Sequence, residues 1–195
     1  MILAPSNVRT ALLQRATALD VRQPKEERRA SVAIVLSGHD NDAAICFIER
    51  VERPGDRWSG DVAFPGGWAN DDDDSLRHTA IRETQEEVGL DLRQAEHLGD
   101  LPLTPINTGS RLGDIGSSVF YLRESQPTLQ PDPRECADAF WVPCRHLLDR
   151  DNGTSLDWEG SDFPGIEYDR RVIWGLTYRM LHDFFAILRR EFKPS

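Results

Sequence analysis

Hydrophobic and polar residues alternate along this chain in short blocks, and the spacing of the apolar positions predicts strands and helices in mixture. Short runs that are rich in β-branched and aromatic side chains, and that end at turn residues, are typical of strands. Such runs lie at 31–36, 43–48, 96–103, 117–122 and 137–142.

Apolar residues that recur every three or four positions predict helices near both ends of the chain. We expect Ser6 to cap a helix over 7–19 and a short helix to begin within 145–148. A closing amphipathic helix is expected over 172–192.

Two longer segments show no clear period. Residues 104–116 are polar and contain glycine, so we expect a loop that is long enough to carry function. Residues 152–168 are expected to be irregular, with Trp158 and Phe163 folding them back onto the body of the protein. Strands mixed with a few helices indicate an α/β sandwich.

The length of 195 residues favours one domain, with a helical extension over 1–30 and a core over 31–195. No apolar run approaches the about 20 residues that span a membrane, and the N-terminus is not typical of a signal peptide. The three cysteines are odd in number and lack paired ligand spacing. Cys46 and Cys136 lie in strand-like runs, so we expect buried thiols in a reducing cytoplasm.

The chain is acidic, with a formal net charge of -10 and a pI near 4.9. Duplex nucleic acid is bound by basic surfaces, so this balance argues against a nucleic-acid partner. An acidic protein can still bind a small phosphorylated metabolite if divalent cations and a few arginines neutralise the phosphates. We therefore expect a small-molecule nucleotide partner, and a homodimer is possible.

A glycine turn and a helix follow one another in the first half of the chain. Phe64-Pro65-Gly66-Gly67 ends a short apolar run, and paired glycines let the backbone approach a bulky anion. The acidic loop 70–74 comes next, with Asp74 or Ser75 available to cap a helix. Gly89 is well placed to end that helix.

The helix carries Glu83, Glu86 and Glu87 at positions i, i+3 and i+4, so their side chains emerge close together on one face. Most of its apolar residues fall on a different face. A metal site whose ligands are all carboxylate oxygens suits Mg²⁺ or Mn²⁺ better than zinc, which prefers His and Cys ligands. A solvated acidic face is the alternative for these three residues by themselves.

In its context the helix resembles the signature box of the Nudix hydrolases, G-x5-E-x7-R-E-U-x-E-E-x-G-U, where U is aliphatic. The second half of the box is matched by Arg82-Glu83-Thr84-Gln85-Glu86-Glu87-Val88-Gly89-Leu90. There are departures in the first half and at one aliphatic position. The early glutamate falls on Asp73 or Asp74, the loop is one residue longer, and Thr84 replaces the first aliphatic residue.

The resemblance extends beyond the box to the group of coenzyme A pyrophosphatase-like Nudix proteins. Residues 53–67 are similar to the segment before the box in that group, with Gly60 and the arginines Arg53 and Arg57. Segments 139–143 and 173–177 are similar to late segments of the proteins of that group. The Leu-Leu-Thr start of the group's signature is absent, because Cys46-Phe47-Ile48 stands there, and the spacing from arginine to glycine is shorter.

The resemblance implies a Nudix-type α/β/α sandwich with a mixed sheet that hydrolyses a pyrophosphate bond with Mg²⁺ or Mn²⁺. It implies that Glu83, Glu86 and Glu87 bind the metal and that Arg82 holds Glu83. Coenzyme A or a derivative is the expected substrate. ADP-ribose, NADH, dinucleoside polyphosphates, or binding of a nucleotide without catalysis are the alternatives.

Other residues have two interpretations each. Glu135 lies where the family often supplies a further carboxylate, although a solvated loop residue is the favoured interpretation. Arg53 and Arg57 are candidates to bind phosphate, and Gly66 and Gly67 to admit metal and phosphate, but arginines are also ordinary surface residues. Trp58 is a candidate to stack on a base, although tryptophan more often packs.

Overall fold

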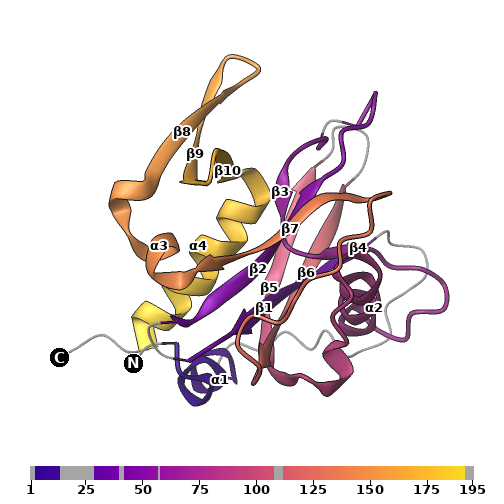
Figure 1. Cartoon of the computed structure of the whole chain (residues 1–195), viewed down its shortest axis with the longest axis vertical. Helices are drawn as coiled ribbons and strands as arrows, with labels where there is room; N and C mark the ends of the chain where they lie inside the picture. The colour runs from indigo at the N-terminus through magenta and orange to yellow at the C-terminus, as the bar shows by residue number, and fades with distance from the viewer. Residues whose placement is uncertain (1–2, 14–28, 40–41, 57, 108–111, 192–195) are drawn as a thin grey trace.

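The computed structural model describes residues 3–13, 29–39, 42–56, 58–107 and 112–191. In these ranges a large sheet lies between helices, and a smaller sheet stands beside it (Figure 1). The large sheet has the strand order β3-β2-β1-β6-β5, with β4 also paired to β1 and β7 to β2. Its strands are β1 (Arg29–Ser37), β2 (Ala44–Arg50), β3 (Val62–Ala63), β4 (Gly66–Trp68), β5 (Glu96–Asn107), β6 (Leu112–Leu122) and β7 (Cys136–Pro143).

The large sheet is mixed. Strands β1 and β6 pair in parallel from Arg29 opposite Asp114 to Ser37 opposite Leu122, whereas its other pairs are antiparallel. Helix α2 (Leu76–Val88) packs on one face, and α1 (Pro5–Leu13) and α4 (Gly175–Glu191) pack on the other (Figure 1). The prediction of an α/β/α sandwich with a mixed sheet is confirmed.

Strand β1 explains how the two layers of core are separated. Successive side chains of a strand point to opposite faces. Ile34 and Leu36 therefore pack in the cluster that contains α1 and α4, while Ala33 and Val35 pack in the cluster beneath α2. A central strand that is buried on both faces has a continuous apolar run, and the run 32–36 in the sequence has this character.

The smaller sheet corrects the prediction that residues 152–168 are irregular. Residues 153–168 form an antiparallel hairpin that pairs from Gly153 opposite Ile166 to Trp158 opposite Ser161, and successive residues of β8 alternate between exposed and half-buried. Trp158, Phe163 and Trp174 cluster within this sheet with ring centres 5.6 to 6.1 Å apart. The contact that bears on the predicted fold-back is that of Trp158 with Trp58, which lies between β2 and β3, with ring centres 6.4 Å apart. The sheet and its connections contain α3 (Cys144–Leu148), η3 (Arg150–Asn152), β8 (Gly153–Trp158), β9 (Ser161–Tyr168) and β10 (Arg171–Trp174).

The closing helix was predicted to begin at 172, and this start is wrong. Residues Arg171–Trp174 form strand β10, in which Ile173 pairs with Ile166 of β9. Gly175, with a φ of 61°, turns the chain from the strand into α4. Backbone pairing with a neighbouring hairpin here prevails over the helical spacing of the side chains.

The predicted loop 104–116 is also mostly strand. Thr104 pairs with Ile115 and Asn107 with Leu112, so β5 and β6 form a long hairpin. β5 lies at the border of the large sheet, and two of its exposed residues are Pro102 and Pro105. Polar residues and prolines suit the border of a sheet, and for this reason the segment has the composition of a loop.

The N-terminal helix begins earlier than predicted. Pro5 is its first residue, and the amide of Val8 donates to the carbonyl oxygen of Ala4 at 3.0 Å, so Ser6 is not the cap. Proline suits the first turn of a helix because its position needs no amide hydrogen. Val8 and Leu12 are completely buried against the core. The predicted residues 14–19 of this helix lie outside the described ranges.

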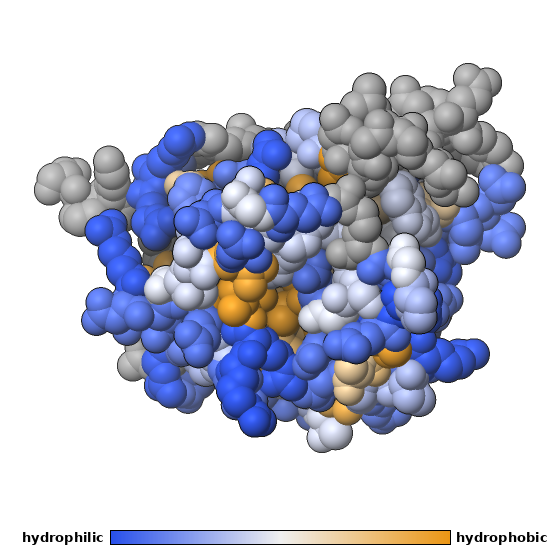
Figure 2. Space-filling view, turned by 90° about the horizontal axis from the view of Figure 1, so that it is seen from above, coloured by the Kyte–Doolittle hydropathy of each residue, from blue (hydrophilic) through white to orange (hydrophobic). Residues whose placement is uncertain are grey.

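The surface is largely hydrophilic, as the mean hydropathy of -0.50 predicts. Figure 2 shows the molecule from above, where polar residues surround a small recessed hydrophobic patch. None of the helices in the described ranges is long and apolar enough to cross a bilayer. Cys46, Cys136 and Cys144 are buried thiols, as predicted for the first two.

Candidate active site

The glycine turn brings the backbone between β3 and β4 against β1. The amide of Ala33 donates to the carbonyl oxygen of Pro65 at 2.8 Å, and Gly66 pairs with Val32. A Cβ atom on Gly66 would lie 2.3 Å from the carbonyl oxygen of Ser31 and 2.6 Å from Cα of Val32. Only glycine fits this close approach of two backbones.

Helix α2 has the predicted ends. Ser75 is the N-cap, and its hydroxyl accepts from the amide of His78 at 3.1 Å. Gly89 has a φ of 75° and donates to the carbonyl oxygen of Gln85. Thr84, which departs from the box, is buried and donates its hydroxyl proton to the carbonyl oxygen of Ala80 at 2.7 Å. The helix therefore accommodates this hydroxyl without an unpaired polar atom.

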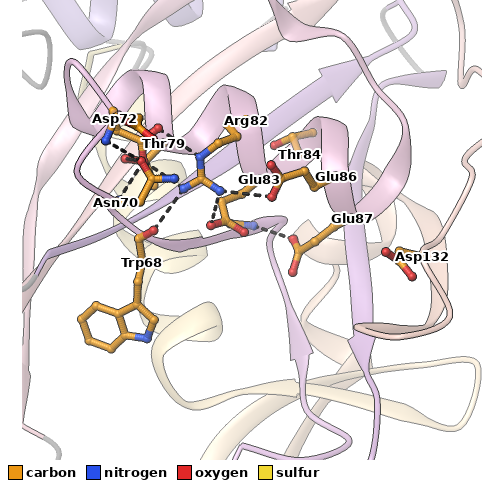
Figure 3. Close-up of polar contacts among 12 residues, drawn as sticks. Trp68, Asn70, Asp72, Thr79, Arg82, Glu83, Thr84, Glu86, Glu87 and Asp132 are labelled. Atoms are coloured by element: carbon orange, nitrogen blue, oxygen red, sulfur yellow. Dashed lines mark hydrogen bonds and ion pairs between the residues drawn. The ribbon is translucent and has the colours of Figure 1, made fainter.

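Arg82 lies at the centre of the polar face of α2 (Figure 3). Its Nε and Nη2 donate to the two carboxylate oxygens of Asp73 at 3.0 and 2.8 Å. Its Nη1 donates to Glu83 at 2.8 Å and to Glu86 at 3.1 Å, and Nη2 also donates to the carbonyl oxygen of Trp68. A guanidinium fork with this many partners fixes the carboxylates around it.

Of the two candidates for the early carboxylate, Asp73 is the one that Arg82 binds. The Asp73 side chain is 2% exposed and accepts from Thr79 and from the amide of Asn70, each at 3.0 Å, besides Arg82. Burial alone would raise the pKa of Asp73, but these hydrogen bonds, led by Arg82, lower it below its usual value. The neighbouring Asp74 is exposed.

Glu87 and Glu83 lie beside the glycine turn. Glu87 is 3% exposed, and its Oε2 accepts from the amide of Gly66 at 2.8 Å. Burial, together with the charges of Glu83 and Glu135, raises the pKa of Glu87 to about 8. Burial also raises the pKa of Glu83. A Cβ atom on Gly67 would lie 2.5 Å from the carboxyl carbon of Glu83, so this glycine makes room for that carboxylate.

A third carboxylate joins these two from a distant part of the chain. Oxygen atoms of Glu83, Glu87 and Glu135 all lie within 4.8 Å of one another. The segment before Glu135 crosses the end of α2, where the amide of Asp132 donates to the carbonyl oxygen of Glu87 at 2.9 Å. Glu135 is exposed, as the favoured interpretation of a solvated loop residue predicts, and it also lies beside the box, as the other interpretation predicts. The sequence pattern does not show this proximity, because it depends on a contact between segments far apart in the chain.

Glu86 is not part of this group of three. Its side chain is 57% exposed and turns back along the helix to Arg82, four positions earlier. The structure thus brings together two of the three predicted metal ligands, Glu83 and Glu87, and adds Glu135 in the place expected for Glu86. The i, i+4 pair with Arg82 is the physical reason for the difference.

The predicted substrate-binding residues are more dispersed. The Arg53 guanidinium is exposed and donates to the carbonyl oxygen of Arg134, next to Glu135. Arg57 lies outside the described residues. Trp58 is 36% exposed and packs nearly parallel to Trp158 of the smaller sheet, with ring centres 6.4 Å apart. The packing interpretation of Trp58 therefore agrees with the structure.

The group formed by Glu83, Glu87 and Glu135 fits a hard divalent cation. Its donors are carboxylate oxygens, which Mg²⁺ and Mn²⁺ prefer. Within the described ranges no arginine donates a hydrogen bond to Glu87, and burial raises the pKa of Glu83 and Glu87 because it disfavours their negative charges. A bound cation would compensate them.

Comparisons with known proteins agree with this arrangement. The sequence model of the NUDIX domain matches residues 27–159. The mitochondrial coenzyme A diphosphatase NUDT8 of Homo sapiens is 31% identical over 153 residues, which cover 76% of this chain and 64% of that protein. An uncharacterized Nudix hydrolase NudL of Pectobacterium atrosepticum is 29% identical over 167 residues, which cover 84% of each chain.

Solved structures share the fold. An Ap4A hydrolase of C. elegans, solved as a binary complex, superposes with a TM-score of 0.54 at 14% identity, covering 83% of this chain and 98% of that one. The shared fold, the glycine turn followed by the box helix, and a family model that matches more than half of the residues lead to one conclusion: the chain belongs to the Nudix hydrolase family.

Proposed function

We propose that this protein hydrolyses a pyrophosphate bond in a nucleoside diphosphate that is linked to another group, with Mg²⁺ or Mn²⁺ as cofactor. The observation that carries the proposal is the convergence of Glu83, Glu87 and Glu135 within 4.8 Å beside the glycine turn. Phosphoryl transfer in proteins depends mainly on positioning and on neutralising charge. Three carboxylates at one point provide a place for the cation that does both.

The residues around this point have separate roles in the proposal. Glu83, Glu87 and Glu135 hold the cation, and Glu86 remains a predicted ligand on the same helix. When bound, the cation neutralises phosphate oxygens and lowers the pKa of a water molecule. Arg82 orients Glu83, since the two are joined by a 2.8 Å hydrogen bond.

The chemical step needs an acceptor for one proton. The oxygen of a water molecule bonds to phosphorus, the bond from that phosphorus to the bridging oxygen breaks, and the leaving phosphate takes the bond's electron pair. A carboxylate oxygen of the group that faces the water and is not bound to the cation would accept the water's proton.

We propose coenzyme A or a derivative as the substrate, with 4′-phosphopantetheine and 3′,5′-ADP as the products from coenzyme A itself. Two similarities support this choice: segment 53–67 resembles that of the coenzyme A group, and human NUDT8 is named as a coenzyme A diphosphatase. ADP-ribose, NADH and dinucleoside polyphosphates are the alternatives. A module that binds a nucleotide without cleaving it is disfavoured, because all three box glutamates are present.

The partners remain as predicted: a small nucleotide substrate, no nucleic acid, and a possible homodimer. The net charge of -10 supports a small phosphorylated substrate over a polymer. A cytoplasmic location also stays a prediction.

The experiment is a hydrolysis panel with product identification. Purified protein is incubated with coenzyme A, acetyl-coenzyme A, ADP-ribose, NADH and diadenosine polyphosphates, with Mg²⁺, with Mn²⁺ or with EDTA. We expect metal-dependent cleavage of coenzyme A to 3′,5′-ADP with kcat/KM of about 10⁴ M⁻¹s⁻¹ or more. Faster hydrolysis of another compound would make that compound the proposed substrate in place of coenzyme A. Nucleotide binding without turnover of any compound would favour the non-catalytic alternative.

A further inference from the structure

Two acidic side chains face each other where strands β2 and β7 come together. Glu49 of β2 is directly opposite Asp138 of β7 in the antiparallel ladder. Like charges directly opposite each other destabilise a pair of strands. The next pair is Arg50 with Cys136, and the register shifts between Glu49 and Arg50. This end of the ladder therefore needs a cation to keep its geometry.

Arg171 of β10 supplies that cation from the smaller sheet. Its Nε donates to Glu49 and its Nη2 to Asp138, both at 2.6 Å, and its Nη1 donates to Asp169 at 3.0 Å. The centre of the guanidinium lies 4.5 Å from the centre of the Phe140 ring. The Arg171 side chain is 21% exposed. A planar fork with these partners holds the two strands in one relative position.

The same end of the ladder leads directly to Glu135. β7 begins at Cys136, one residue after Glu135, and the amide of Val51, one residue after β2, donates to the carbonyl oxygen of Glu135 at 3.0 Å. The Arg53 guanidinium donates to the carbonyl oxygen of Arg134. The position of the Glu135 backbone is thus set by the ends of β2 and β7.

Arg171 acts from the far side of the sheet. Phe47, two residues before Glu49 and so on the same face, belongs to the core cluster that contains α4. Cys46 and Ile48 point to the other face, toward α2 and its glutamates. Arg171 reaches the face of Phe47, so any effect on Glu135 passes through the strands.

We propose that Arg171 is a positioning residue of the active site. By bridging Glu49 and Asp138 it fixes the end of the β2–β7 ladder and so holds Glu135 beside Glu83 and Glu87. The inference rests on the proposed function, because it takes Glu135 as a ligand of the cation. It gives the smaller sheet a role in catalysis, and Arg171 lies beyond the residues 27–159 that match the NUDIX model.

The test is a double-mutant cycle between Arg171→Met and Glu135→Gln, with Mn²⁺ affinity measured by calorimetry without substrate. Arg93→Met is the matched control, because Arg93 is an exposed arginine that pairs with Asp91 away from the ladder. We expect Arg171→Met to weaken Mn²⁺ binding about 10-fold in the wild-type background and less than about 2-fold when Glu135 is already glutamine. Arg93→Met should leave the affinity unchanged.

Two further measurements separate positioning from general stability. Hydrogen exchange at the amide of Val51, which binds the carbonyl of Glu135, should accelerate in Arg171→Met while amides inside α2 stay protected. If Arg171→Met does not fold, Arg171→Lys keeps the charge and loses the fork, and we expect it to weaken Mn²⁺ binding about 3-fold with the same dependence on Glu135.

Several results would overturn the proposal. Losses of Mn²⁺ affinity that simply add in the double variant, or an unchanged affinity in a folded Arg171 variant, would show that Arg171 does not act through Glu135. Failure of the proposed function is distinguishable, because a wild-type protein that binds Mn²⁺ but cleaves no nucleotide still allows the cycle to be measured. A wild-type protein that binds no Mn²⁺ would overturn both.

Discussion

Asp73 lies in the loop just before α2 and Glu87 in the last turn of that helix, and both carboxylates are almost completely buried. Asp73 accepts two hydrogen bonds from Arg82 and two more from Thr79 and the amide of Asn70, and its pKa lies below the usual value. Glu87 accepts from one amide, that of Gly66, and its pKa rises to about 8 through burial and like charges. Burial therefore does not distinguish a structural carboxylate from a candidate ligand, whereas the number of donors and the nearest charge do.

The largest effect is expected from Glu87→Gln. The change removes the buried negative charge that has no arginine partner and keeps the size of the side chain, so we expect kcat/KM for the preferred substrate to fall about 10⁴-fold with the fold intact. Asp91→Asn, at a half-buried carboxylate just after the same helix that pairs with the exposed Arg93, should leave kcat/KM unchanged. Steady-state kinetics with Mg²⁺ measures both. Activity of Glu87→Gln within tenfold of wild type would contradict the assignment.

The second prediction concerns pH in the absence of metal. In the folded protein Glu87 keeps a proton up to about pH 8, whereas its ordinary pKa is 4.5. The folded state then binds more protons than the unfolded chain, so the stabilisation is complete below about pH 4.5 and is lost as the pH rises through about 8. We expect the free energy of unfolding in EDTA to fall by about 3 kcal/mol between about pH 5 and pH 7.5.

Urea denaturation at a series of pH values measures how steeply the free energy of unfolding falls with pH. Saturating Mg²⁺ should flatten this slope, because the cation compensates the charge that deprotonation creates. The slope should also be shallower in Glu87→Gln. An identical slope in wild type and Glu87→Gln would assign the pH dependence to other groups.

The third prediction compares the two glycines of the turn. In Gly67→Ala the new Cβ lies 2.5 Å from the carboxyl carbon of Glu83, which is the end of a side chain and can move. We expect kcat/KM to fall about 100-fold with little change in Tm, since the carboxylate is displaced. In Gly66→Ala the new atom meets backbone atoms of Ser31 and Val32, so a large loss of Tm is expected. Equal losses of Tm in the two variants would show that the Glu83 side chain cannot move away from the new Cβ atom.

The smallest effect is expected at Asp73. Asp73→Asn removes the charge that Arg82 faces, so we expect a loss of about 1–2 kcal/mol of stability and a fall of about tenfold in kcat/KM as Glu83 becomes less well oriented. The adjacent Asp74→Asn changes an exposed carboxylate and is the matched control. Thermal unfolding and kinetics of the two variants decide whether Asp73 rather than Asp74 supports Arg82.

The parts of the site that follow from local sequence were predictable. Ser75 and Gly89 bound the helix through their own backbone and side-chain hydrogen bonds, and Arg82 meets Glu83 within one turn. The place of Glu135 did not follow from its sequence neighbours, because it depends on hydrogen bonds to distant segments: the amide of Val51 donates to the carbonyl oxygen of Glu135, and the amide of Asp132 donates to the end of α2. The sequence pattern also does not show whether the Glu86 side chain points toward the other box glutamates or back toward Arg82, and in the structure it pairs with Arg82.

In the fold as well, elements with a local sequence signal were predicted, and those that depend on pairing with a distant segment were not. The central strands β1 and β2 contain continuous apolar runs and were found close to their observed positions, whereas the predicted strands cover only part of β5 and β6 and most of β7. The hairpin of β8 and β9 and the long pairing of β5 with β6 were missed, because each has a polar outer side and its pairing joins residues that a short window does not compare. The strand β10 was mistaken for the first turn of α4 for the same reason.

The prolines of β5 have a consequence for assembly. Pro102 and Pro105 are exposed on the border strand of the large sheet, and their nitrogen atoms carry no hydrogen. A strand of a second molecule therefore finds no continuous row of amide donors there, which protects the folded protein against edge-to-edge aggregation. If the chain forms a homodimer, we expect its subunits to meet through side-chain surfaces and not by extending this sheet.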